Sequence, residues 1–149
     1  MYKLLAIIGK SGTGKDSIFS AITQNPTYCP KVPLKRIIGT TTRPKREGEI
    51  DGVHYHFISS SDFFTLDQTG SMFGVSGFRG WYYGTTYSEL QPNVINIGIF
   101  DPDRVRDIVE NEKDIDLKVV CIMASDKERL MRQLNREETP DVDEIVRRY

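Results

Sequence analysis

The residues best suited to bind a phosphate lie near the start of the chain. Residues 9–15 read Gly-Lys-Ser-Gly-Thr-Gly-Lys, which fits the pattern G-x-x-x-x-G-K. In such a loop the glycines expose backbone N–H groups, and the following helix adds partial positive charge. The pattern predicts a nucleotide-binding phosphate loop; the alternative is an ordinary glycine-rich turn. The expected nucleotide ligands are Gly9, Ser11, Gly12, Thr13, Gly14, Lys15, Asp16 and Ser17.

Asp16 departs from the usual phosphate-loop pattern, which has Ser or Thr after the lysine. A hydroxyl at that position normally holds Mg²⁺. A carboxylate is also a hard oxygen ligand for Mg²⁺, either directly or through water. We therefore predict Mg²⁺ as a cofactor and Asp16 as its ligand, a role that Ser17 can share.

A second basic cluster follows at residues 40–57. It reads Thr-Thr-Thr-Arg-Pro-Lys-Arg-Glu-Gly-Glu over 40–49 and Asp-Gly-Val-His-Tyr-His-Phe over 51–57. Arg43 and Arg46, with Pro44 between them, are suited to clamp one phosphate by bidentate hydrogen bonds. Tyr55 adds a hydroxyl donor. Generic loop charge is the alternative explanation for the two arginines.

The charge distribution agrees with a localised anion site. Residues 1–50 carry nine Lys or Arg against three Asp or Glu, although the whole chain has a net charge of −1. Residues 101–149 carry ten basic and fourteen acidic side chains. A basic first third in an otherwise acidic chain indicates an anionic ligand, whereas chance on a solvated surface is the alternative.

Alternating apolar and helical patterns predict the elements that position these residues. Strands are expected at 3–8, 36–39, 94–99 and 117–123. Helices are expected from the phosphate loop to residue 24, from Asp101-Pro102 to 111, from the capping box at 125–128 to 135, and from about 141. Strands that alternate with helices predict an α/β fold, with a parallel sheet flanked by helices.

Residues 40–92 interrupt this alternation. They are rich in Thr, Ser, Gly and aromatic side chains, with one short helix expected at 61–68 and antiparallel strands within 72–83. We interpret them as a small β-rich insert. Phe78, Trp81 and Tyr82 are expected in its core and not on a nucleic-acid surface, so no nucleic-acid partner is expected.

The composition bounds the class of protein. The chain has 149 residues, of which 38% are hydrophobic and 28% charged. These values suit one globular domain and exclude disordered, collagen-like and disulfide-scaffold classes. We expect no signal peptide and no membrane span, because no apolar run approaches about 20 residues. Cys29 and Cys121 are too few for a disulfide framework, which favours a reducing, cytoplasmic location.

The chain resembles the guanylate kinase family. The matching segments are GKSGTGK, TTTRPKREGEIDGVHYHF, Trp81-Tyr82-Tyr83-Gly84-Thr85 and the later arginines, and they span essentially the whole chain. The resemblance implies one domain with a P-loop NTPase-type core (1–39 and 93–149). It also implies a nucleoside-monophosphate-binding insert at about 40–92 and an arginine-bearing lid at about 132–143. The implied reaction transfers the γ-phosphoryl group of ATP to GMP or dGMP with Mg²⁺.

The resemblance also implies residue roles. The acceptor nucleotide is expected to contact Thr40, Arg43, Arg46, Tyr55, Tyr83 and Thr85. The expected catalytic cations are Lys15, Arg43, Arg132, Arg136, Arg147 and Arg148. Arg132 and Arg136 are four residues apart and are expected on one helical face. Their alternative role is a helix surface paired with Glu128 or nearby acids.

Several positions depart from the family pattern. Gly74 occupies the place of a glutamate that reads guanine, and Gly39 or Thr40 that of a serine used for the base. Asn96 and Gly98 occupy the places of two aspartates. Asp101 and Asp103 follow closely and offer replacement carboxylates, as does Asp16. The chain also ends at Tyr149, before a helix, a strand and a final helix of the family, so we expect a fragment or a longer natural sequence.

Three functions remain open from the sequence. The first is a nucleoside monophosphate kinase, for GMP and dGMP or for a broader set of (deoxy)nucleotides, as a monomer or homodimer without a membrane partner. The second is a non-catalytic, guanylate-kinase-like binding module, which the lost acids favour and the retained Gly14-Lys15 disfavours. The third is a P-loop ATPase of another kind.

Overall fold

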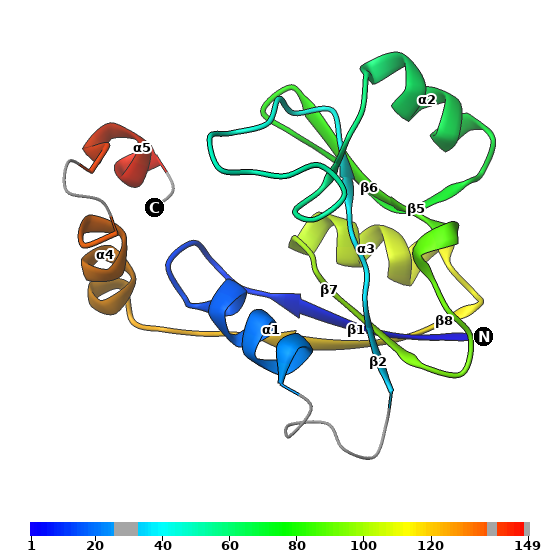
Figure 1. The fold of residues 1–149 in the computed structure, drawn as a ribbon, viewed down its shortest axis with the longest axis horizontal. Coiled ribbons are helices and arrows are strands. Elements are labelled where there is room, and N and C mark those ends of the chain that lie inside the picture. The colour runs from blue at the N-terminus through cyan, green and yellow to red at the C-terminus, as the bar shows by residue number, and fades with distance from the viewer. Residues whose placement is uncertain (26–32, 137–139, 148–149) are drawn as a thin grey trace.

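The computed structural model describes residues 1–25, 33–136 and 140–147. Four parallel strands form the first sheet, with β1 and β7 at its centre (Figure 1). In spatial order they are β2 (Leu34–Arg36), β7 (Ile95–Ile99), β1 (Tyr2–Ile8) and β8 (Ile115–Cys121). The expected α/β fold with a parallel sheet is therefore confirmed.

The apolar run in β1 is buried because helices cover both faces of the sheet. Leu4 and Ala6 belong to a core cluster with Ile108 of α3 (Pro102–Asn111). Ile7 packs in a second cluster with Phe19 of α1 (Lys15–Gln24). Successive side chains of a strand point to opposite faces, so a continuous apolar run supplies both clusters.

Residues 40–86 build the second sheet. Its spatial order is β4 (His56–Phe57), β3 (Thr40–Thr41), β6 (Trp81–Thr86) and β5 (Met72–Phe78). The strands β5 and β6 form an antiparallel hairpin, and β3 joins β6 antiparallel and β4 parallel. Helix α2 (Ser60–Gln68) and the 3₁₀ turn η2 (Tyr87–Glu89) complete this part of the chain.

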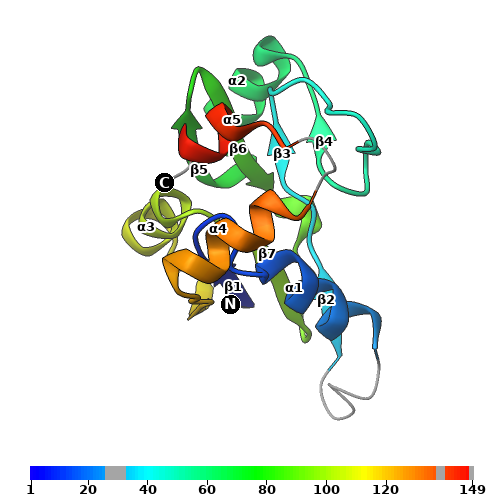
Figure 2. The same cartoon turned by 90° about the vertical axis from the view of Figure 1, so that its left-hand side faces the viewer.

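Helix α3 lies between the two sheets and packs against β5 and β8 (Figure 1). Helices α4 (Asp126–Leu134) and α5 (Val142–Arg147) follow, and Figure 2 shows α4 beside the start of α1. The capping box at Ser125 and Glu128 is confirmed, as is the Asp101 cap followed by Pro102 at the start of α3. No helix among the described residues is both long and apolar enough to cross a membrane.

Two predicted strand positions are wrong by two or three residues. The strand expected at 36–39 is Leu34–Arg36, because the Ile38 N–H donates to the Glu89 carboxylate and not to a strand. The strand expected at 117–123 is Ile115–Cys121, because its pairing with β1 already begins between Tyr2 and Ile115.

The expectation that three insert aromatics form a core is wrong for Phe78 and Trp81, whereas the partly exposed Tyr82 packs its ring against Phe63 and Phe64 of α2. Phe78, Trp81 and Tyr82 are 58%, 39% and 37% exposed. Phe78 and Trp81 pair at the tip of the β5–β6 hairpin, next to the turn at Arg79 and Gly80. Because this tip projects beyond the neighbouring β3, no other strand of the described part of the chain covers it.

Candidate functional site

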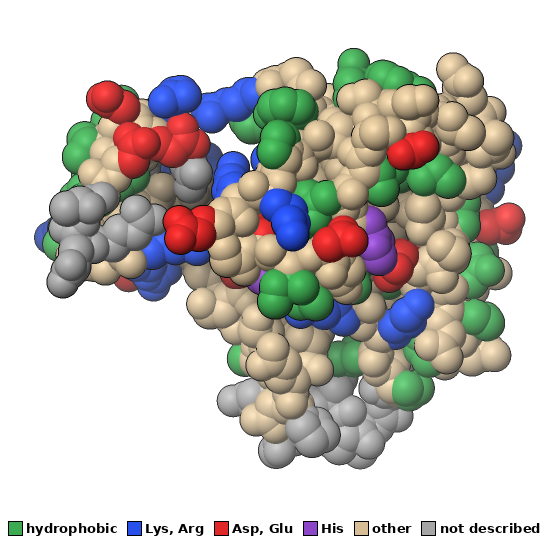
Figure 3. All heavy atoms as spheres, turned by 45° about the horizontal axis from the view of Figure 1, so that its top comes forward, with side chains coloured by type: hydrophobic (Ala, Val, Ile, Leu, Met, Phe, Trp, Pro, Cys, Tyr) green, Lys and Arg blue, Asp and Glu red, His purple; other side chains and the backbone are tan. Residues whose placement is uncertain are grey.

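A cleft of about 1010 Å³ lies between α1 and the loop that follows β3. Ser11 and Lys15 line it from the phosphate loop, and it is also lined by Tyr83 of β6 and by Tyr55, which directly precedes β4. Its cations are Lys15, Arg36, Arg43, Arg46 and Arg136, against the carboxylates of Asp16, Glu47 and Glu49. Figure 3 shows Lys and Arg side chains (blue) where the left-hand end of the molecule, which holds α5, meets the rest. The excess of cations suits an anionic ligand.

The phosphate loop connects β1 to α1 with the backbone conformation that an anion site requires. Gly12 and Gly14 have φ values of 80° and 88°, in the region that favours glycine. A Cβ on Gly12 would lie 2.8 Å from the Arg129 carbonyl oxygen, so the position also needs glycine for space. No side chain caps α1 at Gly14, which leaves the first N–H groups of the helix for a ligand.

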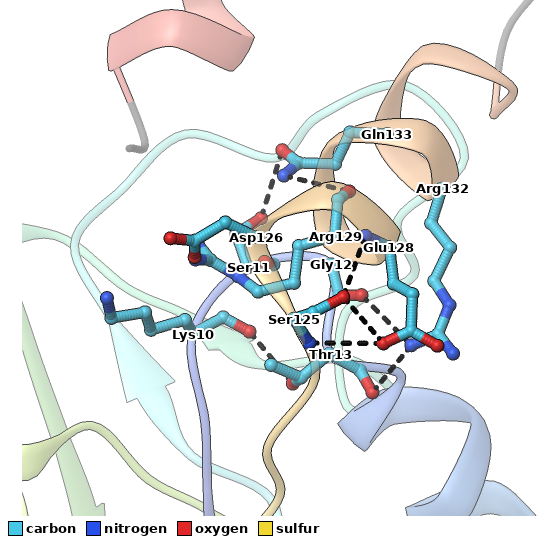
Figure 4. A network of polar contacts seen from close by, with 10 residues as sticks. All are labelled: Lys10, Ser11, Gly12, Thr13, Ser125, Asp126, Glu128, Arg129, Arg132 and Gln133. Carbon is cyan, nitrogen blue, oxygen red and sulfur yellow. Dashed lines mark hydrogen bonds and ion pairs between the residues drawn. The ribbon is translucent and has the colours of Figure 1, made fainter.

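Helix α4 holds the phosphate loop from behind (Figure 4). The buried Arg129 donates from Nε to the Ser11 carbonyl oxygen at 3.0 Å and from Nη1 to Asp126 Oδ1 at 2.6 Å. The Ser11 hydroxyl donates to Gln133 Oε1 at 3.4 Å. Sequence reasoning missed this clamp, although the spacing of Arg129, Arg132 and Gln133 places all three on one helical face.

Arg132 and Arg136 have different positions, and the expectation of one shared helical face is wrong. Helix α4 ends at Leu134, so Arg136 lies beyond the helix and lines the cleft. The Arg132 guanidinium donates to the carbonyl oxygens of Gly12 and Thr13, at 3.3 and 3.1 Å.

Of the two remaining predicted lid cations, Arg147 is the one that the structure describes. The exposed Arg147 forms an ion pair with Glu144 at 3.5 Å and does not line the cleft. Arg148 lies outside the described residues, as does Cys29. The segment expected as a lid begins at Arg132, in the last turn of α4, and ends at Asp143, in the first turn of α5.

Arg43 is held in place by Glu49, a residue that sequence reasoning did not single out. The Arg43 guanidinium donates to both Glu49 carboxylate oxygens at 2.9 and 2.8 Å, and it is 9% exposed. The Arg46 N–H donates to the same carboxylate at 2.7 Å. Glu49 therefore closes the loop that carries both arginines. Its position three residues after Arg46 was the available sequence signal.

This pair predicts a specific pH dependence of stability. The hydrogen bond from Arg43 lowers the pKa of Glu49 from 4.5 to about 2. A lowered carboxylate pKa stabilises the fold above pH 4.5, and this contribution is lost as the pH falls towards 2. At pH 7 we expect Glu49→Gln to lower the free energy of unfolding by about 1–3 kcal/mol. Urea unfolding from pH 7 to 2.5 measures the difference, which should shrink with falling pH. Glu47→Gln controls for loss of a loop charge, and a difference independent of pH would contradict the prediction.

Tyr55 and Tyr83 form the wall of the cleft on the second sheet. Their ring centroids lie 6.2 Å apart, and the Arg43 guanidinium lies 5.7 Å from the Tyr55 ring centroid. Burial raises the pKa of the Tyr55 phenol, which therefore stays protonated and able to donate at neutral pH. Thr40 and Thr85, also expected to contact the acceptor, are buried and do not line the cleft.

The positions that depart from the family's acids have structural roles here. Asn96 is fully buried, and its amide donates to the Lys3 and Gln91 carbonyl oxygens. A Cβ on Gly98 would lie 2.9 Å from Ile37 Cγ1, so no larger side chain fits. Asp101 accepts hydrogen bonds from the Arg104 N–H and the Ser76 hydroxyl. Asp103 pairs with Arg106 on the exposed face of α3. Neither of these two aspartates lines the cleft.

Gly74 allows α3 to approach β5 closely. It lies at a β-bulge with φ 57°, and a Cβ there would be 3.0 Å from Ile108 Cδ1. A side chain at this position therefore meets both backbone strain and the buried helix. Restoring a glutamate alone requires the Ile108 side chain to shift and the left-handed backbone at this position to accept a side chain.

Substituting Gly74 tests this packing. We expect Gly74→Ala to lower the free energy of unfolding by about 1–3 kcal/mol. Gly70→Ala is the matched control, because Gly70 has a similar φ of 65° with nothing within 4 Å of its Cβ position. Chemical unfolding should show a larger loss for Gly74→Ala than for Gly70→Ala, and Ile108→Val should restore part of the difference. Equal losses of unfolding free energy in Gly74→Ala and Gly70→Ala would contradict the prediction that Ile108 crowds a side chain at position 74.

Asp16 fits a magnesium ligand. Its side chain is 80% exposed and lines the cleft, 3.7 Å from the Lys15 ammonium group. Among the described residues no three His, Cys, Asp or Glu side chains cluster as a metal cage. Mg²⁺ retains several waters and binds one or two carboxylates together with substrate phosphates, so one exposed carboxylate beside the phosphate loop suits it. Ser17 is exposed on the first turn of α1.

The parallel sheet and the phosphate loop define a P-loop α/β protein. The family model described as guanylate kinase matches residues 1–148, and the chain belongs to this family. The guanylate kinase of Vibrio cholerae is 36% identical over 138 residues, and that of Aliivibrio fischeri is 44% identical over 84 residues. These matches cover 89% and 56% of this chain. The chain spans 63% and 39% of the respective relatives.

A solved structure supports the fold. The crystal structure of guanylate kinase from Anaplasma phagocytophilum matches with a TM-score of 0.66 at 21% sequence identity. The match covers 90% of this chain and 69% of that one. At this identity the likeness shows the α/β fold of the chain.

Proposed function

We propose that this protein transfers the γ-phosphoryl group of ATP to a nucleoside monophosphate, with GMP and dGMP favoured. One observation carries the proposal. The phosphate loop and the acceptor cluster of Arg43, Arg46, Tyr55 and Tyr83 line a single cleft. Phosphoryl transfer requires a donor and an acceptor held in line, with cations around the transferring group.

The donor half of the site is the phosphate loop. Backbone N–H groups at the start of α1 bind the donor phosphates, and Lys15 neutralises the β- and γ-phosphates. Arg129 and Gln133 hold the loop through their hydrogen bonds with Ser11. Asp16 would hold Mg²⁺, which would supply additional positive charge to the phosphates.

The acceptor half is the loop closed by Glu49. The bidentate hydrogen bonds from Arg43 to Glu49 fix the Arg43 side chain before substrate arrives, which reduces the entropy lost on binding. Arg46 and the two tyrosine hydroxyls add donors to the acceptor phosphate. The Glu49 carboxylate also offsets part of the Arg43 charge, so Arg46 contributes the larger unpaired share.

Arg136 supplies a cation to the transferring group from the side of α4. It lines the cleft and belongs to the segment expected as a lid. Closure of this segment over the cleft would exclude water and strengthen the electrostatic interactions inside. Arg132 acts through the phosphate loop, whose carbonyl oxygens accept its hydrogen bonds.

A broader acceptor set is the second candidate. The position of the guanine-reading glutamate is Gly74, which packs against α3 and places no carboxylate in the cleft. A wall without that carboxylate discriminates less between bases. The non-catalytic binding module remains the alternative outcome of the test.

A coupled ADP-release assay tests the proposal directly. ATP and Mg²⁺ are combined with each common NMP and dNMP, and the expected result is turnover with GMP or dGMP above the rate with ATP alone. Turnover with several bases would identify the broader kinase. ATP hydrolysis that no monophosphate accelerates would identify another P-loop ATPase. ATP binding without any turnover would favour the binding module and overturn the kinase.

A further inference from the structure

Arg104 is a buried cation with no role in the phosphoryl-transfer scheme above. It is 3% exposed, and its Nε and Nη2 donate to the Gly74 carbonyl oxygen and the Thr85 hydroxyl at 2.7 and 2.5 Å. Its guanidinium lies 4.4 Å from the Phe100 ring centroid. None of the ion pairs within 4.0 Å among the described residues involves it. A buried charge without a carboxylate partner costs free energy relative to an apolar side chain of similar size.

The partners of Arg104 belong to both sheets. Gly74 and Thr85 lie in β5 and β6 of the second sheet, and Phe100 follows β7 of the first. Arg104 itself lies on α3, between the sheets (Figure 1). Because α3 approaches β5 closely at Gly74, the two sheets have little room to shift relative to each other where α3 packs between them.

Thr85 and Phe100, which Arg104 contacts, are each close in sequence to a residue that lines the cleft. Thr85 follows Tyr83 by two residues in β6, so the two side chains share one face of the strand. Phe100 directly follows Ile99, and both Tyr83 and Ile99 line the cleft. Burial raises the pKa of Tyr55, and the nearby positive charge of Arg104 opposes that shift more strongly than the charge of Arg43 does.

We propose that Arg104 is a positioning residue for the acceptor nucleotide. It fixes the wall formed by Tyr55 and Tyr83 relative to the phosphate loop, so that an acceptor bound to one sheet faces a donor bound to the other. This rests on the proposed function, because the acceptor is the ligand assigned to that wall. The donor site, which β1, α1 and α4 build, does not depend on Arg104.

Steady-state kinetics of three variants test the proposal. Arg104→Met retains the apolar length of the side chain, and Arg104→Lys retains the charge with fewer donors. Arg106→Met, on the exposed face of the same helix, is the control. We expect Arg104→Met to raise the acceptor KM at least tenfold, with the ATP KM changed less than twofold. Arg104→Lys should recover part of the loss, and Arg106→Met should match the wild type.

Thermal unfolding separates positioning from a merely structural role. All assays are run at a temperature at which each variant is folded. A lower Tm with an unchanged acceptor KM would overturn the proposal, as would equal increases in both KM values. If Arg104→Met does not fold, the KM values for the acceptor and for ATP are compared in Arg104→Lys instead.

The two proposals fail in distinguishable ways. No turnover by the wild-type chain with any monophosphate overturns the kinase. In that case calorimetric Kd values for GMP test whether Arg104 positions the acceptor. We expect the Kd of Arg104→Met to be at least tenfold higher than that of the wild type. Absence of GMP binding by the wild type overturns both.

Discussion

Replacing Lys15 by alanine is expected to lower kcat by about 100- to 1,000-fold. ATP affinity should fall by about 10- to 100-fold, because a hydrogen bond to a charged phosphate is lost. Lys15 is the cation of the phosphate loop that lines the cleft, beside Ser11. Calorimetry with ATP and the ADP-release assay measure the two effects separately.

The matched control for this variant is Lys127→Ala. Lys127 is an exposed lysine in the first turn of α4 and does not line the cleft. Its removal changes the net charge equally and should leave ATP affinity within about twofold of the wild type. Unchanged ATP binding in Lys15→Ala would contradict a nucleotide-binding role for the loop, and the kinase proposal with it.

Replacing Arg43 by methionine is expected to lower kcat/KM for the acceptor by about 100-fold or more. The same change leaves the Glu49 carboxylate without its bidentate partner, so the free energy of unfolding should fall by about 1–3 kcal/mol. The ATP Kd should not change, because Arg43 lies on the acceptor side. Kinetics and urea unfolding measure these effects on one preparation.

A second variant separates catalysis from stability. In Arg43→Met/Glu49→Gln the unpaired carboxylate is removed, so much of the stability lost in Arg43→Met should return while kcat/KM stays low. Lys45→Met, an exposed change in the same loop, controls for the loss of a positive charge. Recovery of acceptor kinetics in the double variant would show that Arg43 acts through loop stability and not through the acceptor phosphate.

Local sequence determined the elements that rest on short-range interactions. The phosphate loop, the Asp101 cap and the capping box at Ser125 each depend on residues within a few positions of one another. Their dihedral and hydrogen-bond requirements are therefore visible in the order of residue types. The apolar run of β1 likewise predicted a strand buried on both faces, which two core clusters confirm.

Strand ends and exposed aromatics were less predictable because neighbouring elements decide them. Ile38 leaves its strand because Glu89, 51 residues later, accepts its N–H. Trp81 is a large aromatic residue of the type usually found in a core. It is exposed because β3 ends before it reaches the tip of the β5–β6 hairpin. The pattern of residue types along the chain does not show which strand is shorter than its neighbour in the sheet.

The order of residue types along the chain predicted a phosphate loop, a basic acceptor segment and the strands and helices of the parallel core. The packing of α3 and α4 sets which side chains hold these segments in place. Arg129 reaches the phosphate loop across 118 residues, and Arg104 reaches Thr85 across 19. The physical reason is that a buried polar group must find a partner wherever packing places one. That partner is set by how α3 and α4 pack and not by the residues beside it in the chain.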